Sequence, residues 1–178
     1  TEKPTGADVE PLYADDIKYL ELRGREDFEA TIEAYTYPDA FAECDGSAQL
    51  ATGVIVGQQR RKPFGLCYRT VIGNDNEFNG YGFKLHLIYG CSVSPSERGY
   101  STINDSPEAI TFSWEVSTVP VNVKGFKPTA SLVIDSTKCD ETKLAAIENI
   151  LYGTDAGEGT EATAPRLPLP DEIATMLK

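Results

Sequence analysis

Apolar and polar residues alternate with a period of two in several parts of this chain, and this pattern most constrains its fold. Residues 28–35 place Phe, Ala, Ile and Ala opposite Glu, Thr, Glu and Tyr. Residues 110–116 place Phe112, Trp114 and Val116 opposite Thr, Ser and Glu. Because successive side chains of a β-strand point to opposite faces, each segment predicts a strand with one buried and one exposed face.

The other periodic segments add strands and one good helix. Apolar side chains of residues 140–152 fall on one helical face, and Gly153 is a suitable C-terminal stop. A single helical turn is predicted at 39–44, and a short helix with Pro170 in its first turn near the C-terminus. The further predicted strands are 12–22, 53–59, 64–72, 81–89 and 129–135. These elements predict a mainly β (α+β) fold, an antiparallel β-sandwich or barrel with one flanking α-helix.

A chain of 178 residues suits one domain with an arm. We expect an extended leader at 1–11, a β-sandwich domain at 12–153, and a linker with a C-terminal arm at 154–178. No apolar run approaches the ~20 residues that span a bilayer, and no signal-peptide pattern is present. The chain begins with Thr1, and we expect that it has been processed or trimmed.

Four widely spaced cysteines lack any C-x-x-C pair. They predict reduced thiols in a reducing compartment, and a secreted sandwich with two disulfides is the alternative. The positions are Cys44, Cys67, Cys91 and Cys139.

Negative charge is concentrated near the N-terminus. Residues 1–57 hold four basic and thirteen acidic side chains, which accounts for −9 of the net charge of −12. Such a section repels nucleic acid and anionic membranes. Together with the absence of a recognisable catalytic cluster, it indicates a functional surface rather than a pocket.

Several local patterns imitate chemical sites. His86 is the only histidine, has no nucleophile motif to accompany it, and is interpreted as a strand-face residue. Residues 75–80 resemble the start of a calcium loop, but the twelfth position falls on a histidine, so a hairpin tip is favoured. The glycines of 153–159 follow a predicted helix and indicate a linker. Glu29 and Glu33 have no nucleophile nearby and indicate a solvated face. We therefore expect no enzyme activity, no cofactor and no metal.

The only basic cluster is Arg60-Arg61-Lys62. Two interpretations remain open: a solvated loop, or a contact with the acidic section of another copy of the chain, since segregated opposite charges favour head-to-tail contacts. The long irregular segment 90–107 is also expected to be functional. The predicted subunit contacts are Arg60, Arg61, Lys62, Ser94, Glu97, Arg98, Asn104 and Asp105.

Long stretches of the chain resemble major tail proteins (tail tube proteins) of long, non-contractile-tailed bacteriophages. The resemblance spans roughly residues 11–152. It is carried by residues 11–20 (PLYADDIKYL), 33–46 (EAYTYPDAFAECDG), 64–75 (FGLCYRTVIGND), 81–90 (YGFKLHLIYG), 94–97 (SPSE), 102–116 (TINDSPEAITFSWEV) and 133–137 (VIDST). Members of that family carry a further segment before the motif at Pro11, and we expect this segment to be absent or trimmed here.

The resemblance implies a structural protein of the virion. In that family a β-sandwich with a flanking helix forms hexameric rings that stack into a hollow tube. Viral DNA passes through its electronegative lumen during ejection, without specific binding. The implied partners are other copies of the chain and the tail tip or baseplate, tape measure and tail terminator proteins. The implied location is the phage tail, assembled in the bacterial host cytoplasm, with no cofactor and no membrane segment.

The polar faces of the two early strands are the predicted lumen wall. The residues are Asp16, Lys18, Glu29 and Glu33. One alternative is a monomeric or trimeric β-sandwich binding module, such as an adhesin or a capsid decoration protein. A second is a β-sandwich glycosidase with two carboxylates.

Overall fold

A computed structural model describes residues 1–178 apart from 7–8, 15–16, 24–25, 76–77, 96, 98, 101–109 and 157–160. The chain divides into two compact units. Unit 1 comprises Thr1–Pro63 and Ser92–Thr118, and unit 2 comprises Phe64–Cys91 and Val119–Lys178. The described residues form ten strands and two α-helices, and the six strand pairings with a described register are all antiparallel. The predicted mainly β, α+β class is therefore confirmed.

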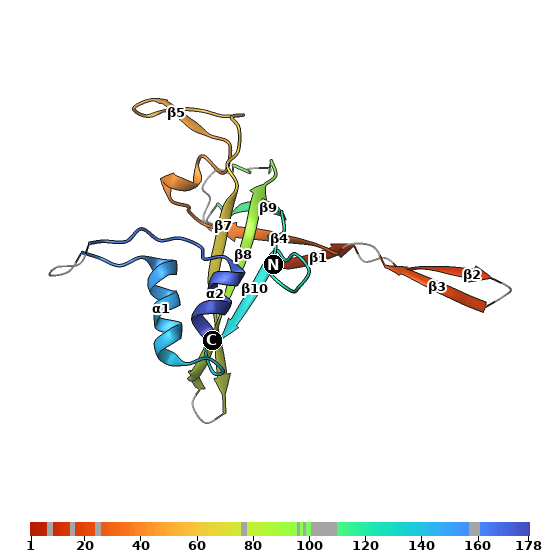
Figure 1. Ribbon diagram of the computed structural model, residues 1–178. Coiled ribbons are helices and arrows are strands. Elements are labelled where there is room, and N and C mark those ends of the chain that lie inside the picture. The colour runs from red at the N-terminus through yellow and green to blue at the C-terminus, as the bar shows by residue number, and fades with distance from the viewer. Residues whose placement is uncertain are drawn as a thin grey trace. The chain divides into compact units, whose positions relative to one another are not determined.

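Unit 1 contains a sheet with the strand order β1-β4-β9 and two hairpins (Figure 1). The sheet strands are β1 (Glu2–Gly6), β4 (Glu26–Ala34) and β9 (Phe112–Thr118). The hairpins are β2 (Val9–Ala14) with β3 (Ile17–Arg23), and β5 (Ala48–Ala51) with β6 (Val54–Val56).

Three details differ from the sequence predictions. The single strand predicted at 12–22 is wrong, because the chain reverses within it and forms β2 and β3. Aspartate is frequent in turns, so the two adjacent aspartates of this segment were a sequence signal for a chain reversal. The segment expected as a leader contains β1, which pairs with β4 along its whole length. The strand predicted at 53–59 is shorter and has a hairpin partner in β5.

One face of the unit 1 sheet is apolar and carries an aromatic cluster. Trp114 and Val116 are buried and lie opposite Ile32 and Ala30. Tyr37 meets the Trp114 ring edge to face at 5.3 Å. The Trp114 indole Nε1 donates to Asp45 Oδ1 at 2.9 Å, so this buried carboxylate has a partner from 69 residues away. This packing fixes which face of the sheet is turned to solvent.

Unit 2 is a sheet with the order β7-β8-β10, covered by two helices. Its elements are β7 (Phe64–Asn74), β8 (Phe78–Val93, the last two residues of which belong to unit 1), β10 (Ser131–Asp135), α1 (Glu141–Tyr152) and α2 (Pro170–Leu177). The core packs alternate residues of β8 and β10 against both helices. Its buried members are Leu85, Leu87, Tyr89, Ile134, Leu144, Ile147, Leu151 and Ile173.

Helix α1 confirms the helix predicted at 140–152. The Asp140 side chain caps its first turn by accepting from Lys143 N at 3.1 Å. Gly153 ends the helix with φ of 74°, in the left-handed region that favours glycine. Leu144, Ile147 and Leu151 face the core, as the periodicity predicts.

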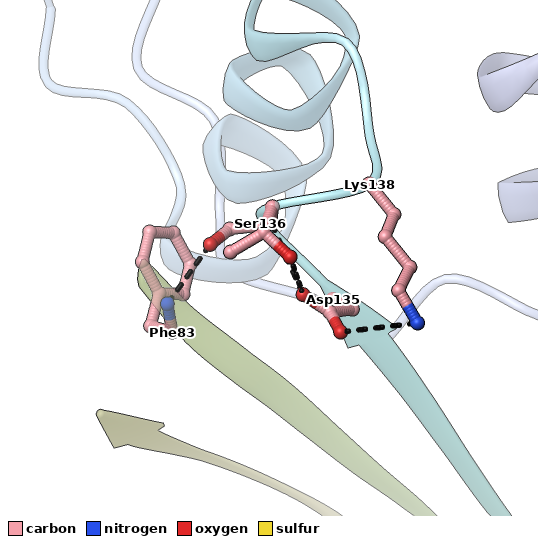
Figure 2. A network of polar contacts seen from close by, with 5 residues as sticks. Phe83, Asp135, Ser136 and Lys138 are labelled. Carbon is pink, nitrogen blue, oxygen red and sulfur yellow. Dashed lines mark hydrogen bonds and ion pairs between the residues drawn. The ribbon is translucent and has the colours of Figure 1, made fainter. Parts of the chain in front are cut away.

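The turn between β10 and α1 is held by polar contacts. Phe83 N donates to Ser136 Oγ at 2.9 Å, which ties the turn to β8 (Figure 2). Lys138 Nζ lies 3.8 Å from Asp135 Oδ2 within the same turn (Figure 2). These contacts set the direction in which the chain leaves the sheet and enters α1.

The C-terminal segment packs on unit 2. The buried Tyr89 hydroxyl donates to Pro168 O at 3.0 Å. The Leu167 side chain lies against Gly65, where an added Cβ would come within 2.5 Å of it. Ile173 of α2 is buried in the core. Residues 161–178, expected to form part of a linker and arm, therefore contribute apolar contacts to the unit.

Candidate functional surface

The face of the β1-β4-β9 sheet opposite the aromatic cluster is polar throughout the described strands. Glu29 of β4 lies between Lys3 of β1 and Ser117 of β9, and directly opposite residues share a face of an antiparallel sheet. Along the same face, Thr31 lies opposite Glu115. The remaining members are Thr5, Asp27, Glu33 and Ser113. We call this set the acidic sheet face.

The acidic sheet face carries four carboxylates and one ammonium group. Glu29, Glu33, Glu115, Asp27 and Lys3 are all exposed, and the remaining members carry hydroxyl groups. The face is therefore anionic and hydrated, and Lys3 is the one cationic side chain among its described members.

A shallow hollow of about 110 Å³ lies in this face. Its polar lining comes from Lys3, Glu29, Thr31, Ser94, Glu115 and Ser117. Ser94 is positioned by its backbone N–H, which donates to Glu115 O at 2.8 Å. Among the described residues, no three His, Cys, Asp or Glu side chains gather as a metal site requires. The described lining of the hollow supplies hydroxyl, carboxylate and ammonium groups and contains neither histidine nor cysteine.

Of the four predicted lumen residues, the acidic sheet face contains Glu29 and Glu33. Asp16 lies outside the described residues. Lys18 belongs to β3, and its side chain is not described. The structure adds Lys3, Asp27 and Glu115, which sequence reasoning missed as members. The alternation around Trp114 already pointed to the side of the strand on which Glu115 lies, but only the pairing register brings it beside β4.

The three basic residues after the β5–β6 hairpin have different environments. Arg60 is exposed. Arg61 is partly buried, with its Cγ near Gly46. Lys62 Nζ forms an ion pair with Glu43 of the same chain, and this contact raises the Lys62 pKa. Arg60 is thus the member best placed to meet another molecule, and the predicted subunit contact remains a prediction.

The first four residues of the predicted contact segment 90–107 belong to β8, which continues to Val93. Ser94 is partly buried beside the hollow, and Glu97 is exposed. Arg98, Asn104 and Asp105 lie outside the described residues.

His86 lies on the sheet of unit 2 and belongs to no cluster of catalytic groups in the described part of the chain. Its ring stacks on Tyr68 with centroids 4.6 Å apart, and its Nε2 lies 2.9 Å from Thr70 Oγ1. These are contacts of a strand-face histidine, the interpretation that the sequence favoured.

All four cysteines are free thiols. Cys91 is fully buried, and burial raises its pKa to about 11. Burial also raises the pKa of Cys67 and of Cys44. Since the thiolate is the reactive form, these shifts disfavour nucleophilic chemistry at all three positions.

Neither helix of the described residues has the length and apolar character needed to cross a bilayer. Comparison with family models, curated proteins and solved structures finds no match to this chain.

Proposed function

We propose that this chain is a tail tube subunit of a long, non-contractile-tailed bacteriophage. Six copies form a ring, and stacked rings form a tube whose lumen conducts DNA during ejection. The resemblance of residues 11–152 to that family carries the proposal. The mainly β fold with flanking helices and the acidic sheet face are compatible with it.

The acidic sheet face gives the proposal a physical mechanism. DNA carries one negative charge per about 1.7 Å of its length, and each fixed lysine on a channel wall holds phosphate by releasing counterions. A wall dominated by carboxylates repels phosphate at short range, and hydroxyl groups keep it hydrated. We place Glu29, Glu33 and Glu115 on the lumen wall, where they let DNA pass without binding it.

The proposal includes the partners and location implied by the family resemblance. Other copies of the chain build the rings, and the tail tip or baseplate, tape measure and tail terminator proteins meet the tube at its ends or within it. The tube belongs to the virion and assembles in the host cytoplasm. The chain performs no chemistry.

Electron microscopy of the purified chain over a range of concentrations tests the assembly. We expect hollow tubes of stacked six-fold rings, with Glu29 and Glu33 facing the bore in a helical reconstruction. A chain that stays monomeric or trimeric at every concentration contradicts the proposal and favours a β-sandwich binding module. Tubes in which both glutamates face outward contradict the lumen assignment alone.

A charge reversal tests the lumen mechanism. Tubes of the Glu29→Lys/Glu33→Lys variant should retain labelled duplex DNA at low salt, with roughly tenfold or greater loss of retention on raising the salt, since each phosphate contact steepens the salt dependence. Glu161→Lys, an exposed position in unit 2, is the single-site control. Equal DNA retention by native and doubly reversed tubes would contradict the mechanism.

A further inference from the structure

Unit 2 presents an exposed aromatic side chain between two cations. In residues 122–128, here called the Phe126 loop, Phe126 is 80% exposed. Lys124 and Lys127 flank it and are exposed as well. A phenyl ring exposed to water contributes no hydrophobic stabilisation to the isolated chain. Aromatic residues at the centre of an interface contribute much of its binding energy.

The Phe126 loop has a closed base. Val121 and Thr129 pair through two backbone hydrogen bonds, with Val121 N donating to Thr129 O at 2.9 Å and Thr129 N donating to Val121 O at 3.0 Å. Phe126 N donates to Val123 O at 3.2 Å across the tip. The φ of Gly125 is 81°, which suits glycine within this turn.

A further contact fixes the loop to helix α2. Lys124 N donates to the Asp171 carboxylate at 3.0 Å. The loop is therefore held at its base, its tip and one side before any partner arrives. A contact element ordered in advance loses little conformational entropy on binding, so a single ring can serve as an anchor.

The charge distribution indicates where such a loop binds. Unit 1 holds 8 basic and 17 acidic side chains, a net charge of −9, whereas unit 2 holds 8 basic and 11 acidic ones, a net charge of −3. Two lysines beside an exposed phenyl ring are complementary to an acidic surface that also carries an exposed aromatic ring. Unit 1 of a second copy has both properties.

The aromatic cluster of unit 1 is the receiving site that fits best. Tyr37, Phe41 and Phe112 are partly exposed, and Tyr37 meets Phe112 edge to face at 5.2 Å. Asp39 lies between Tyr37 and Phe41 in the 3₁₀ turn η1 (Asp39–Phe41) and is exposed. The cluster offers ring faces to a phenyl group and a carboxylate to a lysine.

We infer that the Phe126 loop docks on the aromatic cluster of unit 1 in a second copy of this chain. Phe126 packs on the partly exposed rings, and Lys127 pairs with Asp39. The contact is heterologous, because different surfaces of the two copies meet, and repetition of it builds a ring or a filament. The inference deepens the proposed function by assigning one contact between subunits.

Sedimentation velocity with single-residue variants tests the docking. Phe126→Ser should raise the dissociation constant for self-association by about tenfold or more, as the loss of a central aromatic anchor does. Tyr152→Ser, which removes another exposed aromatic ring of unit 2, should leave self-association unchanged. Circular dichroism of the variants controls for folding. Equal self-association of the native chain and Phe126→Ser would overturn the inference.

A charge swap tests the predicted ion pair. Lys127→Glu should weaken self-association, more at low salt than at high salt, because salt screens exposed charges. Adding Asp39→Lys to Lys127→Glu should restore much of the loss, since the pair is then reversed. Failure of the double variant to recover, with Lys127→Glu alone impaired, would overturn the assignment of Asp39.

Cross-linking locates the receiving surface directly. A benzophenone amino acid replaces Phe126, and this chain is mixed with an isotopically labelled copy before irradiation. Cross-links between labelled and unlabelled peptides within 37–45 or 112–118 support the inference. Cross-links only to other regions overturn it. Duplex DNA or anionic vesicles that bind through Phe126, while no second copy does, overturn it as well.

The same experiments separate this inference from the proposed function. Tubes that form normally from Phe126→Ser refute the docking and leave the tail tube proposal standing. Small oligomers that depend on Phe126 and never become tubes support the docking and refute the tube. A native chain that never self-associates refutes both.

Discussion

Replacing Gly90 with alanine should destabilise unit 2 much more than the same change at Gly125. Both glycines have positive φ, 59° at Gly90 and 81° at Gly125. An added Cβ at Gly90 would lie 2.4 Å from Val119 O, whereas one at Gly125 would have nothing within 4 Å. The two substitutions therefore share a backbone penalty and differ in steric contact.

The shared penalty is small. Holding an L-residue in the left-handed region costs about 1–2 kcal/mol. Alanine also restricts the unfolded chain, which offsets about 0.4–1 kcal/mol. Gly125→Ala should therefore lower the free energy of unfolding by about 1 kcal/mol.

The steric penalty at Gly90 adds to this. The obstructing atom is a backbone oxygen and cannot rotate away, and Val119 N donates to Gly90 O at 3.0 Å in the same contact. Moving the Val119 backbone away from β8 strains that hydrogen bond, worth about 1 kcal/mol, and disturbs the buried neighbours Tyr89 and Cys91, at about 1–3 kcal/mol. Gly90→Ala should lower the free energy of unfolding by about 3–5 kcal/mol.

Urea unfolding followed by far-UV circular dichroism measures both effects at a protein concentration that avoids assembly. A difference of about 2 kcal/mol or more between the variants corresponds to a midpoint shift of roughly 1 M urea. Equal destabilisation by the two substitutions would refute the steric argument, because the contact with Val119 O is the feature that separates them.

Three further outcomes are expected in unit 2. Tyr89→Phe should lower the free energy of unfolding by about 1–2 kcal/mol, because Pro168 O loses its buried donor; urea unfolding measures this, and no change would mean that water replaces the hydroxyl. Cys91 should be the last thiol alkylated by iodoacetamide at mildly alkaline pH, since burial raises its pKa to about 11; peptide mass spectrometry that finds it modified early would contradict this. The Thr137 hydroxyl donates a hydrogen bond to Asp135 and lowers its pKa. The contact therefore stabilises the fold at pH values above the ordinary carboxyl pKa, and this stabilisation is lost as the pH falls towards the lowered pKa. The difference in free energy of unfolding between the native chain and Thr137→Val should then decrease on acidification. A difference that stays constant in urea unfolding at acidic pH would refute the argument.

Local patterns in the sequence predicted several elements well. Helix α1 begins after Asp140 and ends at Gly153, because an acidic cap, a regular apolar face and a glycine all act within a few residues of one another. The alternation in 28–35 predicted β4 and the exposure of Glu29 and Glu33 for the same reason. A strand places successive side chains on opposite faces whatever its partners are.

The contacts between distant segments were decided only by the tertiary structure. Asp45 meets Trp114, and Glu115 joins Glu29 on one face, through pairings that no local pattern encodes. The Phe126 loop follows no periodic pattern in the sequence, and its fixation by Asp171 depends on where helix α2 packs. Sequence determines the periodicity and the charge of each segment, because these are properties of neighbouring residues. Strand order and shared faces depend on which buried surfaces fit together, and that is settled across the whole chain.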